Sequence, residues 1–229
     1  MSAAALHGFS VWTSERRIHL VQLFKSSSRD HALDVVKTYR PDATIGLVDG
    51  LPCTESAETV IDCLRVLPVE PAMILCESAL WQRSVDDASL LEAVNRARHR
   101  RGVAAARAIM ARATALSESA GETRTRLLLE SLPIPRAVQQ FEVLVEGSVY
   151  RLDFAWPDLR VALEFDGLSK YVGDEPTDQV LLRERARENA LVGHGWVIVR
   201  ITWADLTRPE RVHALISAAF DRSRRYRSA

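Results

Sequence analysis

The sequence predicts an α/β protein of 229 residues built from two modules: a mostly helical α+β module at 1–115 and an α/β domain at 116–229. Two observations predict this class. Segments rich in β-branched residues alternate with segments of helical periodicity, and the order of elements changes near residues 112–120. The chain has no internal repeat or low-complexity tract. No apolar run approaches the roughly 20 residues of a membrane span, and the first residues lack a signal-peptide pattern. We therefore expect a cytoplasmic protein.

Composition is that of an ordinary globular protein, with 47% hydrophobic and 26% charged residues. Lys+Arg and Asp+Glu both number 30, so net charge does not argue for a nucleic-acid partner. A local basic patch remains open, because an electrostatic footprint depends on distribution. The densest cationic stretches are 96–101, 183–187 and 222–227. We expect the three scattered cysteines (Cys53, Cys63 and Cys76) to be small buried hydrophobes.

The first module shows strands followed by helices. Strand character is found at 18–24 and 44–48, and Asp49–Gly50 marks a turn. Helical spacing follows at 54–65 (capped by Thr54 or Ser56), 68–80, 84–94 and 102–113. Catalytic residue types do not cluster here, so we interpret the module as a binding unit through which a protein partner could attach.

The second module has the order α-β-β-β-α-β, followed by a last helix. Its first helix, 117–132, has Ser119 and Glu122 at capping-box spacing and stops at Pro133. The expected strands are 138–145, 149–155, 160–165 and 196–201; the expected further helices are 177–193 and 209–222.

The candidate metal-binding carboxylates lie on the strand pair within 150–167. If its turn is centred between Asp158 and Leu159, Asp153 lies directly opposite Glu164. Like charges opposite each other destabilise a sheet, so the pair calls for a cation. Hard divalent ions such as Mg²⁺ or Mn²⁺ take carboxylate oxygens and can activate a water.

The same register sets the neighbours of this pair. It places Arg151 opposite Asp166, and strand alternation places Leu152 and Phe154 together on the apolar face. The plain alternative to a metal site is a solvent-facing sheet surface with an Arg151–Asp166 ion pair.

Several motifs recur in order at compatible spacings: Ser-x-Gly-Glu at 119–122, Arg-Leu-Asp-Phe-Ala-Trp-Pro at 151–157, Ala-Leu-Glu-Phe-Asp-Gly-x-x-Lys-Tyr at 162–171, and the segment 183–203. Over about 110 residues they resemble the very-short-patch-repair-like branch of the PD-(D/E)XK endonucleases. The resemblance implies a restriction-endonuclease-like core that cuts DNA with Mg²⁺ or Mn²⁺.

Carried onto this sequence, the resemblance makes Asp153 and Glu164 the principal metal ligands. Asp166 supports them, where many relatives have the lysine of Glu-x-Lys. Glu122 would complete the site and Lys170 would orient water or stabilise the leaving group.

The resemblance also lets Arg183, Arg187 and Arg200 hold phosphates of a DNA substrate. Each of these assignments has a structural alternative. Glu122 is explained by helix capping, Lys170 by a surface position, and the two helix arginines by pairing with nearby glutamates.

The first module resembles, more weakly, AbiE-type antitoxin-like proteins, on the segment 47–63 and the helices after it. In those proteins a winged helix precedes this region, and we expect that segment to be lacking here. The sequence thus predicts a metal-dependent endonuclease acting on DNA in defence, repair or a toxin–antitoxin setting. The alternative is an inert nuclease-fold protein that binds nucleic acid or acts as an antitoxin-type regulator.

Overall fold

The computed structural model describes residues 1–13, 17–25, 34–167 and 178–228. Its contacts divide the chain into two units, Met1–Thr123 and Arg124–Ala229, with the division inside one helix rather than at the predicted residue 115. In the described ranges, none of the helices is both long enough and apolar enough to cross a membrane.

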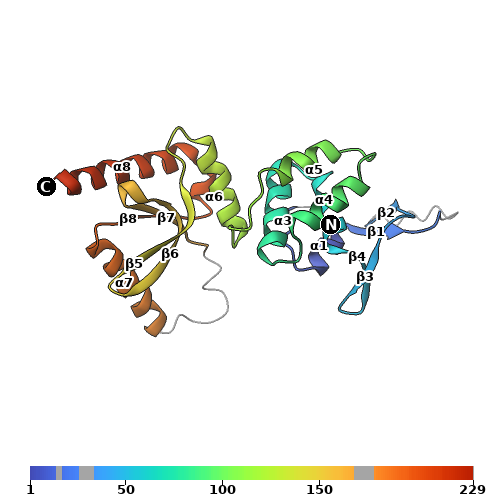
Figure 1. Ribbon diagram of the computed structural model, residues 1–229, viewed down its shortest axis with the longest axis horizontal. Helices are drawn as coiled ribbons and strands as arrows, with labels where there is room; N and C mark the ends of the chain where they lie inside the picture. The colour runs from blue at the N-terminus through green and yellow to red at the C-terminus, as the bar shows by residue number, and fades with distance from the viewer. Residues whose placement is uncertain (14–16, 26–33, 168–177, 229) are drawn as a thin grey trace. The chain divides into compact units, whose positions relative to one another are not determined.

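Unit 1 combines two small sheets with a group of helices (Figure 1). Its elements are α1 Ser2–Leu6, β1 Ile18–Gln22, β2 Val35–Tyr39, β3 Ile45–Val48, β4 Leu51–Thr54, α2 Ser56–Leu64, α3 Val69–Trp81, α4 Asp87–Arg96 and α5 Val103–Met110. The predicted Asp49–Gly50 turn is confirmed: both residues have positive φ and join β3 to β4. The short α1, β2 and β4 were not predicted.

The core of unit 1 lies between α2, α3 and α4. Leu64, Met73, Leu75 and Val94 are fully buried there. The predicted cap of α2 is wrong, because Glu55 is the N-cap residue and its side chain makes no capping bond. The Thr54 hydroxyl is hydrogen-bonded to the Thr59 hydroxyl instead, at 2.6 Å.

A buried ion network ties the segment after β2 to α2. Arg40 pairs with Glu58 and Asp62, and the other Glu58 oxygen accepts the Thr44 N–H at 2.8 Å. Because Arg40 and Glu58 are both almost fully buried, each charge depends on the other for compensation.

Unit 2 has the predicted order of elements. They are α6 Ala120–Ser131, β5 Val138–Val145, β6 Ser148–Trp156, β7 Val161–Phe165, α7 Asp178–Gly193, β8 Val197–Ile201 and α8 Pro209–Ser228, with short 3-10 turns at Pro157–Leu159 and Asp205–Thr207. The sheet order is β5-β6-β7-β8, in which only β7 and β8 are parallel.

Helices cover both faces of this sheet (Figure 1). Phe154 and Leu163 pack on one face with Val212, Ile216 and Phe220 of α8. On the other face, Leu152 and Ala162 pack with Leu191 of α7. Unit 2 is therefore a three-layer α/β domain, and the α/β class predicted from the sequence is confirmed.

The β6–β7 register is the one predicted, because Phe154 pairs with Leu163 and Trp156 with Val161. The prediction that Leu152 and Phe154 share a face is wrong, since they lie in different core clusters. The alternation breaks between them at Asp153. The β5 residue opposite Asp153 is Gln140, which has φ of 50° and is missing from an otherwise continuous ladder. An irregularity of this kind in a strand pair changes the direction in which nearby side chains point.

Candidate functional site

Asp153 lies where β6 and β7 separate. The last backbone pair of this ladder is Phe154 with Leu163. Two residues further along β7, the Phe165 N–H donates to Oδ2 of the Asp153 carboxylate at 2.9 Å, in place of a carbonyl oxygen of the β6 backbone. The next amide, that of Asp166, donates to the Ile201 carbonyl on the β8 side at 2.8 Å. Asp153 thus takes over a ladder position and fixes its carboxylate against β7.

Glu164 directly precedes these two amides on β7, and its side chain is 12% exposed. Arg187 of α7 places Nη2 at 2.6 Å from Glu164 Oε1. Arg200 of β8 places Nε at 3.5 Å from Oε2. Each oxygen of this half-buried carboxylate therefore has a guanidinium beside it.

The two arginines are anchored by further groups. Arg187 Nη2 also donates to the Arg151 carbonyl at 2.9 Å, and Arg200 Nη1 lies 3.0 Å from Glu188 Oε2. Burial acts to lower the pKa of Arg200, but Glu188 and Glu164 outweigh it and hold that pKa above its ordinary value. Two positively charged guanidinium groups therefore stand beside the single negative charge of Glu164.

Two of the three predicted phosphate-binding arginines, Arg187 and Arg200, therefore contact a predicted metal ligand. Within the described ranges, no three side chains of the His, Cys, Asp and Glu types are grouped so that they could hold a metal ion. At Glu164, both carboxylate oxygens instead lie beside guanidinium groups. The proposed pairing of Arg187 with a neighbouring glutamate is also present, at 3.7 Å from Glu184.

Glu122 has the capping role. Its N–H donates to the Ser119 hydroxyl at 3.2 Å, that hydroxyl donates to Glu122 Oε1 at 2.9 Å, and Oε2 accepts the Glu118 N–H at 2.9 Å. The Ser119 hydroxyl thus caps α6 as the spacing predicts, whereas the Glu122 carboxylate accepts the Glu118 N–H, one residue before the Ser119 N–H that a capping box uses. A metal role for this glutamate stays a prediction. Lys170 lies outside the described residues, as does the side chain of Arg183 on α7.

The arrangement has clear chemical capacities. Carboxylate oxygens of Asp153 and Glu164 are ligands of the kind that hard divalent cations take. The planar forks of Arg187 and Arg200 match phosphate oxygens. Two acidic and two basic groups are thus collected on three strands of one sheet and on α7, which packs on it, a balance that residue spacing alone could not reveal.

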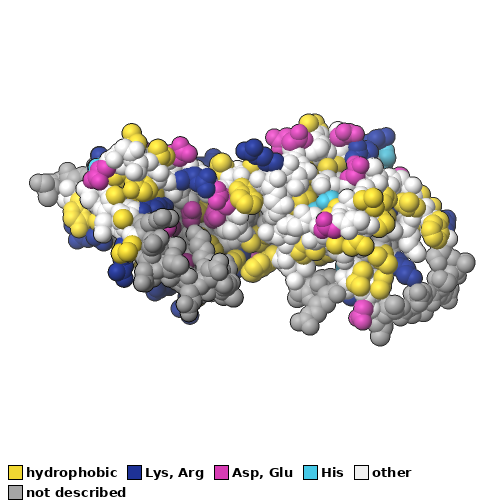
Figure 2. Space-filling view, turned by 90° about the horizontal axis from the view of Figure 1, so that it is seen from below, with side chains coloured by type: hydrophobic (Ala, Val, Ile, Leu, Met, Phe, Trp, Pro, Cys, Tyr) yellow, Lys and Arg dark blue, Asp and Glu magenta, His cyan; other side chains and the backbone are white. Residues whose placement is uncertain are grey.

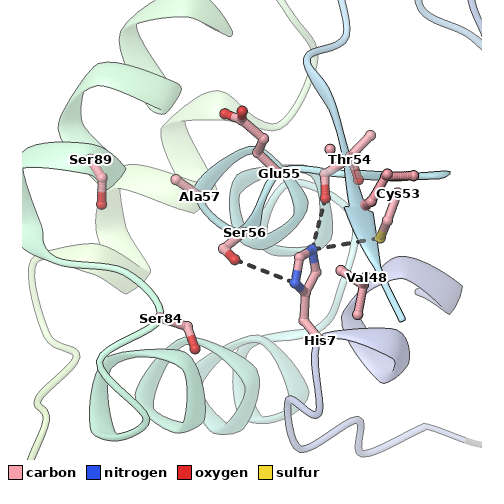
Figure 3. Close-up of a pocket in the computed structure, with 11 residues that line it drawn as sticks. His7, Val48, Cys53, Thr54, Glu55, Ser56, Ala57, Ser84 and Ser89 are labelled. Carbon is pink, nitrogen blue, oxygen red and sulfur yellow. Dashed lines mark hydrogen bonds between the residues drawn. The ribbon is translucent and has the colours of Figure 1, made fainter. Parts of the chain in front are cut away.

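Unit 1 holds a second candidate, a cavity of about 360 Å³ that no sequence motif predicts (Figure 3). His7 projects into it beside Cys53, Thr54 and Ser56 (Figure 3). Other residues along its wall are Gly46, Leu47, Val48, Glu55, Ala57, Ser84 and Ser89.

The His7 and Cys53 pair is not arranged for nucleophilic catalysis. His7 Nε2 lies 2.8 Å from the Thr54 carbonyl oxygen, which can only accept, so Nε2 carries the proton. That nitrogen is 3.6 Å from the Cys53 sulfur and cannot act as its base. Burial raises the pKa of the Cys53 thiol. All three cysteines are free and buried, as expected from the sequence.

Large hydrophobic side chains are exposed on the strands of unit 1, and Figure 2 shows them gathered over that part of the unit. They include Leu20, Leu47 and Leu51, with Leu47 73% exposed. Exposed apolar surface of this kind is what partner proteins cover. The protein partner expected for the first module stays a prediction.

The fold and the site together define a two-unit α/β protein whose second unit carries carboxylates and arginines on a four-stranded mixed sheet and on the helix α7. Two relatives from Mycobacterium tuberculosis match almost the whole chain: uncharacterized protein MT2308 of strain CDC 1551 / Oshkosh and uncharacterized protein Rv2248 of strain ATCC 25618 / H37Rv. Each is 31% identical over 225 residues, which are 97% of this chain and 80% of the relative. The chain belongs to the family of these mycobacterial proteins. No family model matches it, and no solved structure is significantly similar.

Proposed function

We propose that unit 2 is a PD-(D/E)XK-type, metal-dependent endonuclease that hydrolyses phosphodiester bonds of DNA. The observation that carries this proposal is the separation of β6 from β7 at Asp153, with Glu164 and two arginines alongside. Such a break in a sheet brings side chains to a place where a substrate can reach them. The α-β-β-β-α-β order and the motifs that resemble this superfamily support the same proposal.

Asp153 and Glu164 would hold the metal ion, because they provide hard anionic oxygens on adjacent strands. Mg²⁺ or Mn²⁺, when bound, supplies an activated water and offsets charge developing on the phosphate. Asp153 is held in place by the Phe165 amide, so its carboxylate needs little reordering. Arg187 and Arg200 would bind the phosphate and stabilise its charge in a partly desolvated place.

A second candidate is a nuclease-fold protein without turnover that binds nucleic acid or serves as an antitoxin-type regulator. Two observations favour it. Asp166 stands where many members of the superfamily have a lysine, and Glu164 is already paired with Arg187 and Arg200. The broader setting of either candidate would be defence, repair or a toxin–antitoxin pair.

Cleavage of supercoiled plasmid in a panel of Mg²⁺, Mn²⁺ and Ca²⁺ separates the two candidates. We expect nicking with Mg²⁺ or Mn²⁺ that is lost in Asp153→Asn and Glu164→Gln. Glu146→Gln, an exposed glutamate in the β5–β6 turn, is the matched control and should cut normally.

Nicking that persists in both site variants would refute the endonuclease assignment. DNA binding without cutting in any metal would favour the regulator.

A further inference from the structure

The Glu164 carboxylate is enclosed more tightly than a vacant metal ligand needs to be. Arg187 Nη2 contacts Oε1 at 2.6 Å, and Arg200 Nε lies 3.5 Å from Oε2. Glu164 is 12% exposed, whereas the Arg187 and Arg200 side chains are 23% and 42% exposed. Solvent therefore reaches the two cations more easily than it reaches the anion between them.

A divalent cation and these guanidinium groups compete for one anion. A metal ion on Glu164 would stand beside two positive charges in a half-buried place, where screening by water is weak. Its binding therefore requires that Arg187 or Arg200 release Glu164. Neither arginine can become neutral to allow this, because guanidinium stays protonated.

A phosphate group resolves this competition. Its oxygens accept the same planar guanidinium forks that the carboxylate accepts. Arg200 is already shared between Glu164 and Glu188, so its weaker contact of 3.5 Å with Glu164 is the easier one to exchange. Arg187 is held by the Arg151 carbonyl as well as by Glu164, and moving it means giving up both bonds.

We propose that Arg187 and Arg200 form a latch over Glu164 which a DNA phosphate opens, so that metal binding and phosphate binding favour each other. The inference rests on the proposed function and assigns its regulation to this cluster. The protein would bind metal weakly until DNA occupies the site, so that the metal ion would be taken up mainly by the DNA-bound form. Because coupling between two ligands is reciprocal, metal must tighten DNA binding by the same factor.

The test measures Mn²⁺ affinity by electron paramagnetic resonance on the full chain, without DNA and with a short phosphorothioate duplex that resists cleavage. We expect the duplex to tighten Mn²⁺ binding by a factor within the roughly 5- to 150-fold range typical of coupled sites. Arg187→Gln removes the shorter of the two contacts and leaves that of Arg200, so it should bind Mn²⁺ more tightly than the unaltered protein in the absence of DNA and should show weaker coupling. Arg187→Lys keeps the positive charge but lacks the planar guanidinium fork. Its Mn²⁺ affinity and its coupling should therefore lie between those of the unaltered protein and those of Arg187→Gln.

Arg185→Gln is the matched control, because it removes the same charge from an exposed position two residues earlier on α7. It should leave Mn²⁺ affinity and coupling unchanged, and thermal unfolding of each variant confirms that it folds. Mn²⁺ affinity that is equal with and without the duplex, in a protein that does bind the metal, would overturn the latch and leave the nuclease proposal standing. Absence of Mn²⁺ binding from both the unaltered protein and Arg187→Gln, with or without DNA, would overturn both.

Discussion

The bond between the Asp153 carboxylate and the Phe165 amide should have a local cost that can be measured apart from any activity. Asp153→Ala removes the acceptor and leaves the half-buried Phe165 N–H without it. Hydrogen bonds to charged groups contribute about 1.5–3 kcal/mol. If local opening at this amide is cheaper by that amount, its hydrogen exchange should be about 10- to 150-fold faster.

Asp153→Asn separates this structural role from the metal role. Asparagine keeps an oxygen that can accept the Phe165 N–H, and it removes a negative charge beside that amide, which follows Glu164 on β7. Removing like-charge repulsion across a sheet stabilises it by a fraction of a kcal/mol. We therefore expect near-normal stability and normal protection of the Phe165 amide, together with loss of metal binding.

The assay is amide hydrogen exchange followed by NMR, with the Asp166 amide as the internal reference, because it donates to the Ile201 carbonyl and not to Asp153. Equal exchange rates at Phe165 in the unaltered protein and in Asp153→Ala would refute the reasoning. A similar gain in exchange at both amides would indicate general loosening of the sheet instead of loss of one bond.

Two further predictions concern the stability of unit 1. Arg40→Met leaves the buried Glu58 without its guanidinium, whereas Asp62 keeps Arg65 and Arg100. Breaking such a buried pair costs about 3–5 kcal/mol, which urea unfolding followed by circular dichroism measures. A loss of stability below about 1 kcal/mol would contradict the assigned network. Burial, reinforced by Glu77 and Asp87, raises the pKa of the Cys76 thiol from its ordinary value of 9.0 to about 12. The native thiol keeps its proton where the unfolded one has lost it, so the free energy of unfolding should fall between pH 9 and 12, by up to about 1.4 kcal/mol per pH unit. A Cys76→Ala variant should lack this component of the slope, and an identical pH dependence in both proteins would rule it out.

Much of the architecture of unit 2 could be predicted because the signals are local. Val138–Val145 was bounded correctly by its pattern and by the turn that follows, where Glu146 and Gly147 both have positive φ. The β6–β7 register followed from the turn between the two strands. The strands of unit 1 were harder to predict. β2 pairs with β1, which is distant from it in the sequence, and β2 itself shows no alternation of apolar and polar residues.

The sequence by itself determined the α-β-β-β-α-β order, the capping of α6 by Ser119, and the register between β6 and β7. These depend on residue types and spacings a few positions apart. Only the tertiary structure decided what surrounds Glu164, because Arg187 arrives from α7 and Arg200 from β8, and no spacing in the chain specifies that two elements will direct guanidinium groups at one carboxylate. The break in alternation at Asp153 is likewise tertiary, since it occurs opposite the positive φ of Gln140 on the neighbouring strand.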